Sequence, residues 1–209
     1  MNPTIKKAGL FFVLLTVLGT LGWSVRWFLA KRGGEVRLAA RSEQAVPRMV
    51  LGNDTMYRQR DPQWAEEKTG GSRETLSAVG CTVCGLSMAL AQHGVALNPA
   101  ELNRKLQDGG GYTEQGWVKW DAVRGVTGGR VAVELPAHPS QEDIDTALAA
   151  GNPVLVKVYL APGVQHWVLL VGREGREYLM KDPLGDGKSL GLLSSLGSDI
   201  FAVRIVKGR

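Results

Sequence analysis

The sequence predicts an α+β domain, in which helices come first and an antiparallel sheet follows. Between about residues 80 and 152, apolar residues recur at helical spacing, and the segments carry helix start and stop signals. From residue 153 onward, short segments rich in branched and aromatic side chains are bounded by glycine, proline or charged residues. Helices and strands that are segregated in this way, rather than alternating, are typical of α+β domains.

Four segments are predicted to be helices. The first covers Cys81–His93 and ends at a glycine, and the second begins at Pro99 with Asn98 as its cap. A third begins near Trp117. The fourth lies within residues 139–152, where acids occupy the first turn and a glycine follows the last.

The predicted strands are residues 153–160, 166–172, 177–182 and 200–207. The second and third of these flank a turn at Glu174 and Gly175. If the loop has three or five residues, His166 stands opposite Asp182, and paired residues have Cβ atoms about 4.5–5.5 Å apart. A two-residue loop would shift the register and separate them. For the longer loops, the sequence predicts an imidazole held by a carboxylate.

The chain starts with a candidate membrane segment. Residues Ala8–Val25 contain no charge over eighteen positions, follow Lys6 and Lys7, and at helical rise cover most of a bilayer's hydrocarbon core. A cleavable signal peptide is the alternative, but its apolar region usually has ~7–15 residues and ends in a small-residue motif that is not evident here. We therefore expect residues 1–30 to form a single-pass anchor in the inner (cytoplasmic) membrane.

Basic residues near this segment give opposing indications of the side on which the domain lies. Two lysines precede the segment and five Lys or Arg residues follow it, which by the positive-inside rule places the domain in the cytoplasm. A short basic leader before one apolar segment is, however, the usual start of a chain whose remainder is exported. We expect the outer, periplasmic face, with a linker over residues 31–49 and a folded domain over residues 50–209.

The net charge of +5 belongs to the membrane flank. Residues 1–41 contain seven Lys or Arg residues and one acid, whereas residues 42–209 contain 18 Lys or Arg residues and 19 acids. Nucleic-acid binding requires positive charge that is clustered on the folded domain. The charge distribution therefore excludes a nucleic acid as the expected partner.

The two cysteines of the chain lie three positions apart in "GCTVCG", at the start of the first predicted helix. A thiol in the first turn of a helix meets unpaired backbone N–H groups and the positive end of the helix dipole, both of which favour the thiolate. Cys81 is therefore a candidate nucleophile, and Gly80 before it allows close approach of a substrate. Cys84, one turn further along among apolar residues, is predicted to be a packed side chain.

A Cys81–His166–Asp182 set would carry out acyl transfer. The histidine takes the thiol proton, the aspartate fixes the tautomer of the ring, and the thiolate attacks a carbonyl group. The developing oxyanion needs hydrogen-bond donors, of which the Cys81 N–H can be one and a side-chain amide another. Gln59 and Gln63 are the glutamines that the segment before the cysteines supplies.

Four motifs, in this order along the chain, resemble the papain-like cysteine peptidases of family thirty-nine, whose best-known members cut double-glycine leaders from bacteriocins. They are "YRQRDPQWA" (57–65), "VGCTVCGLSMAL" (79–90), "HWVLLVG" (166–172) and "YLMKDPLG" (178–185). The likeness is closer to the stand-alone, C39-like branch, in which a Gln-x-Asp-x-x-Trp segment precedes the Gly-Cys helix. It covers residues 55–207.

This resemblance implies a papain-like α+β fold, with the cysteine helix packed on an antiparallel sheet that carries the histidine and the aspartate. It implies Cys81 as nucleophile, His166 as general base, Asp182 as its orienting partner and Gln59 as the oxyanion-hole amide. Gln63 does not match the motif. The implied substrate is a peptide or protein, and no cofactor or metal is implied.

Two departures from the family pattern are visible. Cys84 stands where the family usually has a small residue or threonine. The transporter-linked members are joined to a membrane exporter and a nucleotide-binding domain, but this sequence has no Gly-x-x-x-x-Gly-Lys-Ser/Thr loop. We therefore expect no ABC exporter in cis.

The same residues are compatible with three other functional interpretations. A C-x-x-C pair at a helix start is also how thiol oxidoreductases are built, although an apolar strand should then end just before the first cysteine. The cysteines with His166 and Asp182 could form a metal site, but structural zinc usually takes two such knuckles. A tethered papain-like domain could also bind peptides or serve in assembly with little activity. Loops 109–112 and 161–165 either border a cleft or are plain connections.

Overall fold

A computed structural model describes residues 36–161 and 163–209, which belong to one folding unit, Val36–Arg209. Within these residues a six-stranded antiparallel sheet has the order β1-β4-β3-β6-β2, and β5 pairs with β4 outside this path. The strands are β1 (Arg41–Val50), β2 (Val131–Glu134), β3 (Val154–Ala161), β4 (Val164–Lys181), β5 (Gly191–Leu192) and β6 (Ala202–Gly208).

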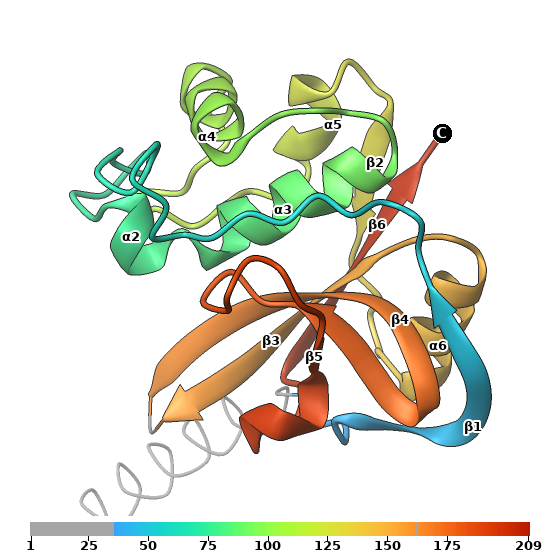
Figure 1. The fold of residues 1–209 in the computed structure, drawn as a ribbon. Coiled ribbons are helices and arrows are strands. Elements are labelled where there is room, and N and C mark those ends of the chain that lie inside the picture. The colour runs from blue at the N-terminus through green and yellow to red at the C-terminus, as the bar shows by residue number, and fades with distance from the viewer. Residues whose placement is uncertain (1–35, 162) are drawn as a thin grey trace, which may run out of the picture. The chain divides into compact units, whose positions relative to one another are not determined.

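The helices confirm the α+β class. Most of them precede the main strands in the chain, and α2, α3, α4 and α5 gather on one side of the sheet, whereas α6 lies beside β4 and β1 (Figure 1). Their bounds are α2 (Leu76–Val79), α3 (Cys81–Gln92), α4 (Pro99–Asp108), α5 (Ala122–Val126) and α6 (Gln141–Ala149), and a short 3-10 turn, η1, covers Leu193–Leu196.

Helix α3 packs directly on the sheet and is buried over most of its length. Gly85 makes this close approach possible, because an added Cβ would lie 2.7 Å from Leu155 Cδ2 on β3. The predicted helix at Cys81–His93 is thus confirmed, with His93 as its C-cap. Among the strands, α3 packs mainly on β4, which carries His166.

The predicted start of the second helix at Pro99 is confirmed, and the fourth helix lies within the predicted residues 139–152. Asn98 and Ser140 each accept a hydrogen bond from the backbone N–H three residues on, and the side chain at that position bonds back to the cap. These capping boxes satisfy backbone donors that would otherwise be unpaired at the helix ends. The third predicted helix starts later than Trp117 and is short, since residues 113–121 contain turns and an isolated β-bridge at Val118, and α5 begins at Ala122.

Strand β4 folds back on itself. His166 and Asp182 are sixteen residues apart in the chain, a span of about 50 Å if extended, yet their side chains are in hydrogen-bond contact. The reversal lies near Gly175, which has φ 57°, a conformation that favours glycine. No irregular loop separates the two arms, because residues on both sides of Gly175 pair with β1.

Strand β1 lies in the range that the sequence analysis assigned to a linker. Its exposure pattern shows no regular alternation, which is why it carried no strand signal, and its pairing with β4 contains two register shifts. The sheet therefore begins at Arg41 rather than near residue 50. β1 follows the outside of the β4 turn (Figure 1).

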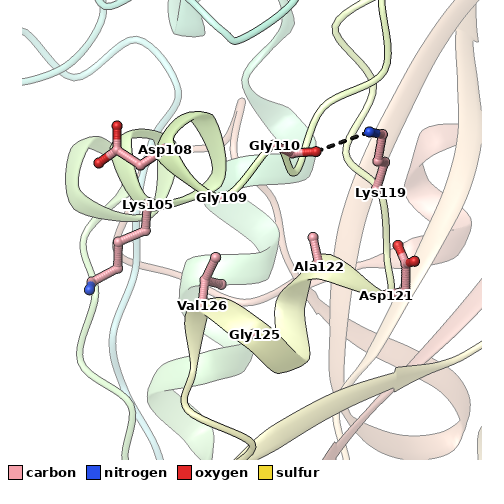
Figure 2. Close-up of a pocket in the computed structure, with 9 residues that line it drawn as sticks. All are labelled: Lys105, Asp108, Gly109, Gly110, Lys119, Asp121, Ala122, Gly125 and Val126. Atoms are coloured by element: carbon pink, nitrogen blue, oxygen red, sulfur yellow. Dashed lines mark hydrogen bonds between the residues drawn. The ribbon is translucent and has the colours of Figure 1, made fainter.

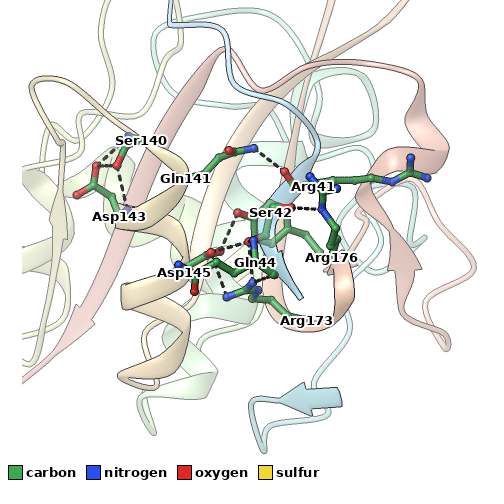
Figure 3. Close-up of polar contacts among 10 residues, drawn as sticks. Arg41, Ser42, Gln44, Ser140, Gln141, Asp143, Asp145, Arg173 and Arg176 are labelled. Atoms are coloured by element: carbon green, nitrogen blue, oxygen red, sulfur yellow. Dashed lines mark hydrogen bonds and ion pairs between the residues drawn. The ribbon is translucent and has the colours of Figure 1, made fainter. Parts of the chain in front are cut away.

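A buried polar network fastens β1 to β4 and α6 (Figure 3). Arg173, which is only 5% exposed, forms an ion pair of 3.1 Å with Asp145 of α6 and donates to Ser42 Oγ at 2.6 Å and to the Gln44 carbonyl. Tyr178 donates to the other Asp145 oxygen at 2.8 Å. Long-range polar contacts of this kind, rather than a local apolar pattern, keep β1 in the sheet.

The predicted membrane anchor, residues 1–30 with its apolar stretch 8–25, lies outside the described residues. Among residues 36–161 and 163–209, the structure contains no helix that is both long and apolar enough to span a bilayer. The strands predicted at 153–160 and 200–207 are confirmed as β3 and β6, with bounds shifted by one or two residues. Strands β2 and β5 were not predicted.

Candidate active site

The two arms of β4 bring the side chains of His166 and Asp182 together. His166 Nε2 lies 2.6 Å from Asp182 Oδ1, and the imidazole is only 2% exposed. The same Asp182 oxygen accepts the backbone N–H of Leu184 at 2.8 Å. Pro183 ends the strand, so the chain turns immediately after the carboxylate and fixes its position.

Cys81 is the first residue of α3 and is 8% exposed. Its side chain lies close enough to the His166 ring to raise the pKa of that ring, through hydrogen bonding and through charge. Because Nε2 of that ring is engaged by Asp182, the nitrogen left for the thiol is Nδ1. The imidazole is thus held by the carboxylate, and the sulfur is its neighbour on the other side.

Gly80 joins the short helix α2 to α3 and sets the position of the thiol. Its N–H donates to the Leu76 carbonyl at 2.8 Å, and an added Cβ would lie 2.4 Å from that same oxygen. No side chain caps the N-terminus of α3. Backbone N–H groups of the first turn thus remain near the sulfur as hydrogen-bond donors.

The contacts of His166 favour its protonated form. Burial alone would lower the pKa of the ring, but the hydrogen bonds and negative charges of Asp182 and Cys81 outweigh it and raise the pKa of His166 to about 9. Burial likewise works against the Asp182 carboxylate, yet its hydrogen bonds from His166 and Leu184 lower its pKa. An ionised Asp182 and a protonated His166 are the states that a thiolate–imidazolium pair requires at neutral pH.

Gln59 lies between the two parts of this site. Its side-chain Nε2 donates to the Ser77 carbonyl at 2.9 Å, just before Cys81 in the chain, and its backbone N–H donates to the Pro183 carbonyl at 2.9 Å, just after Asp182. The side chain is 4% exposed. Since an amide nitrogen carries two N–H groups, one donor remains beyond the bond to Ser77. Gln63, by contrast, is exposed.

Cys84 does not form a redox pair with Cys81 in this structure. Both cysteines are free, and Cys84 is fully buried in the second turn of α3. Burial, together with the negative charges of Cys81 and Asp61, raises the pKa of the Cys84 thiol. A buried thiol with a raised pKa is a poor partner for disulfide exchange. This agrees with the prediction that Cys84 is a packed side chain. Within residues 36–161 and 163–209, no group of three or more His, Cys, Asp and Glu side chains is arranged to bind a metal ion.

A cavity of about 450 Å³ adjoins the site. It is lined by residues that flank the nucleophile and the imidazole in the chain, namely Thr82, Gln165 and Trp167, and by Tyr112 at the end of the loop 109–112. The loop 109–112 therefore borders a cleft, whereas Gln165 lines it as part of β4. Cavities of this size are typical of ligand sites.

A larger cavity, of about 690 Å³, lies between the end of α4 and α5 (Figure 2). Its walls carry two basic and two acidic residues, and Lys119 Nζ donates to the Gly110 carbonyl at 3.0 Å. None of its lining residues is a cysteine or histidine or contacts the Cys81–His166–Asp182 set. We therefore take the smaller cavity as the one that serves the site.

Sequence reasoning did not identify the residues that line this smaller cavity. Three tryptophans contribute, at positions 117, 120 and 167, together with Arg204 of β6. A signal was present in part, because Trp167 directly follows His166 and the other two tryptophans are three residues apart in "WVKW". Arg204 gave no such signal, since its place beside β3 depends on the sheet register.

Comparison with solved structures gives one informative match. A crystal structure from Bacillus anthracis, described as a candidate C39-like peptidase, superimposes with a TM-score of 0.50 and 16% sequence identity, over 78% of this chain and 100% of the other. No family model matches the sequence, and no curated protein does. The chain has the fold of a C39-like peptidase, which confirms the fold that the four sequence motifs implied.

Proposed function

We propose that this chain, which has the fold of a C39-like peptidase, is a cysteine peptidase that cleaves peptide bonds through an acyl-enzyme on Cys81. The observation that supports this most directly is the position of the His166 ring. Its Nε2 is held by Asp182 at 2.6 Å, and the nearby Cys81 side chain raises the pKa of the ring. Nucleophilic acyl transfer needs a nucleophile, a base next to it and a carboxylate that orients the base.

In the first half of the reaction, the proton of the Cys81 thiol resides on His166 Nδ1, as in a thiolate–imidazolium pair, and the thiolate sulfur attacks the carbonyl carbon of the substrate. The C–N bond then breaks, and the leaving amine takes the proton from the imidazolium. In the second half, His166 removes a proton from an incoming nucleophile, which attacks the thioester and frees Cys81. Water as that nucleophile gives hydrolysis, and an amine gives transpeptidation.

Gln59 would stabilise the oxyanion in both halves, together with the backbone N–H of Cys81. Its bond to the Ser77 carbonyl fixes the plane of the amide, and one N–H remains for the substrate oxygen. A donor that is already oriented needs no reorganisation when the charge develops.

We further propose that residues 8–25 tether the peptidase to the inner membrane and that the domain acts on a peptide or protein on the outer face. The support is the uncharged run of eighteen residues with its basic leader. A topology reporter fused after Arg209 tests this side of the membrane. An active periplasmic reporter agrees with the proposal, and an active cytoplasmic reporter contradicts it.

A peptidyl electrophile that acylates thiols tests the chemistry. We expect it to label the full-length protein at Cys81, and we expect Cys81→Ala and His166→Ala proteins to remain unlabelled. Cys84→Ala is the matched control and should label as the native protein does, because Cys84 is buried behind the nucleophile. Failure of the native protein to label, or labelling at Cys84, would contradict a Cys81 peptidase and favour a peptide-binding or redox role.

A further inference from the structure

The cavity next to Cys81 has an unusual combination of charge and aromatic surface. The register of the sheet places several residues that line this cavity on one face. Trp167 of β4 and Ala202 of β6 both pair with Lys157 of β3. Arg204 of β6 pairs with Leu155, the next residue of β3 on the same face. Leu155 points toward α3, because it is the side chain that Gly85 approaches. This face of the sheet is therefore the floor of the cavity, under the start of the nucleophile helix.

Arg204 is half-buried among aromatic rings. Its guanidinium carbon lies 5.3 Å from the centroid of Trp120 and 5.6 Å from that of Trp167, and these two rings are 5.2 Å apart. Stacking of this kind holds the plane of the guanidinium in one orientation. The group is thus positioned in advance rather than free to move with solvent.

The guanidinium has no carboxylate partner within residues 36–161 and 163–209. Its Nη1 donates to the carbonyl of the neighbouring Val203 at 2.8 Å, and its Nε is buried without a hydrogen-bond partner. None of the ion pairs among these residues includes Arg204. The buried Arg173, by contrast, is paired with Asp145 at 3.1 Å.

Burial of an unpaired cation is costly, and proteins usually offset the cost with a carboxylate. The basic wall of the cavity consists of Arg204 and Lys157, whereas its acidic residue, Glu74, is exposed on a separate loop. Trp117, 69% exposed, adds an apolar rim. A ligand with an anionic group and an extended apolar stem would complement this surface.

We infer that this cavity binds a carboxylate of the peptide substrate, with Arg204 as the specificity-determining residue and the Trp120 and Trp167 rings holding it in place. The inference rests on the proposed peptidase function, because it makes the cavity a subsite of the Cys81 centre. The carboxylate is either the side chain of an Asp or Glu near the cleaved bond or the free C-terminus of a short peptide. Planar guanidinium–carboxylate pairing supplies both affinity and orientation.

Binding to full-length Cys81→Ala protein tests the inference without any catalytic step. A random peptide library is equilibrated with this protein, and bound peptides are sequenced. We expect Asp or Glu to be enriched at one position, or free C-terminal acids over their amides, and these two patterns distinguish the sources of the carboxylate. A selected peptide should bind roughly 10- to 100-fold more tightly than its Gln or amide counterpart.

The Arg204→Met change in the same background should abolish that preference, leaving both members of each peptide pair with similar dissociation constants. Arg204→Lys should retain only part of it, because an ammonium group cannot pair in a planar, bidentate manner. Arg104→Met, on the exposed surface of α4, is the matched control and should leave the preference unchanged. A thermal melt of each variant verifies that it folds.

An acidic preference that survives in Arg204→Met, or the absence of any acidic preference with Arg204 present, would overturn the inference. The thiol-labelling experiment remains separate from this one. If the protein binds acidic peptides but does not label at Cys81, the carboxylate subsite is supported and the peptidase function is contradicted. If it labels at Cys81 but shows no acidic preference, the peptidase function is supported and the carboxylate subsite is contradicted.

Discussion

The backbone N–H of Gln59 donates to the carbonyl of Pro183 at 2.9 Å, which ties the proposed oxyanion donor to the residue that follows Asp182. The Gln59 side chain meanwhile bonds to Ser77, four residues before Cys81. One glutamine thus connects the segment that leads to the nucleophile with the turn that holds the carboxylate. A displacement of either segment would move the donor as well.

Replacement of Gln59 by Ala or Glu should therefore lower kcat by about 10²- to 10³-fold with little change in KM, because the donor acts on the transition state. Glutamate keeps the shape of the side chain, but an oxygen atom takes the place of the amide NH2 group and both of its hydrogen-bond donors are lost. Steady-state kinetics on a cleaved peptide measures the effect. Gln63→Ala is the control, and an equal loss there would show that the effect of residue 59 is not specific.

The Asp182→Asn change should reduce kcat/KM by roughly 10²-fold or more. Asparagine keeps an acceptor for the Leu184 N–H but removes the charge that favours a protonated His166. The alkaline limb of the pH–activity profile should therefore move to lower pH. Asp186→Asn, an exposed residue of the same loop, should leave both rate and profile unchanged. An unshifted profile in Asp182→Asn would argue against this orienting role.

Stability should fall as the pH rises from about 6.5 to about 9. The pKa of His166 is raised from its ordinary 6.5 to about 9 in the folded protein, so its stabilising contribution is complete below pH 6.5 and is lost as the pH passes 9. Between these values the unfolded chain has released a proton that the folded chain retains. Urea midpoints of the native and His166→Gln proteins should converge over this range, and parallel curves would contradict the assignment.

The Gly80→Ala change should destabilise the protein by roughly 1–3 kcal/mol and displace the thiol, because the new Cβ would meet the Leu76 carbonyl. Gly125→Ala in α5 is the matched control. Nothing lies within 4 Å of its added Cβ, so a stabilisation of about 0.4–1 kcal/mol is expected. Chemical denaturation measures both, and the rate of Cys81 labelling should fall only in the Gly80 variant.

Loss of the buried ion pair should be far more costly than loss of an exposed one. Arg173→Met leaves Asp145 without its cation at a site where the arginine is 5% exposed, and we expect a cost of about 3–5 kcal/mol. Arg48→Met breaks a pair with Glu174 in which both side chains are about half exposed, and the expected cost is about 0–1 kcal/mol. Similar denaturation midpoints for the two variants would show that the network does not hold β1.

The elements that were predictable from the sequence are those with local signals. Helix α3 has apolar spacing and a glycine stop, and the caps of α4 and α6 are readable from Asn98 and Ser140. The contact between His166 and Asp182 followed from the period of two along a strand and from a turn at Gly175. In each case the information lies within about twenty residues of chain.

The features that were missed depend on distant residues. Strand β1 is held by Arg173, and that residue in turn depends on Asp145 of α6, so no window around Arg41–Val50 contains the cause. The place of Arg204 in the cavity depends on the register of β6 against β3. The alternation of apolar and polar residues along a strand does not specify which residues of two strands pair, because many registers place the same apolar residues inward.

The positions of the site residues along the chain also suggest an order of events during folding. The two arms of β4 are close in the chain, and hairpins form within about 1–10 μs, whereas Cys81 reaches the site only when α3 docks on the sheet, after a long loop has closed. We expect the imidazole–carboxylate pair to form before the sulfur arrives. An unfolded or nascent chain would then carry an ordinary thiol, and nucleophilic reactivity would appear only once the domain has folded.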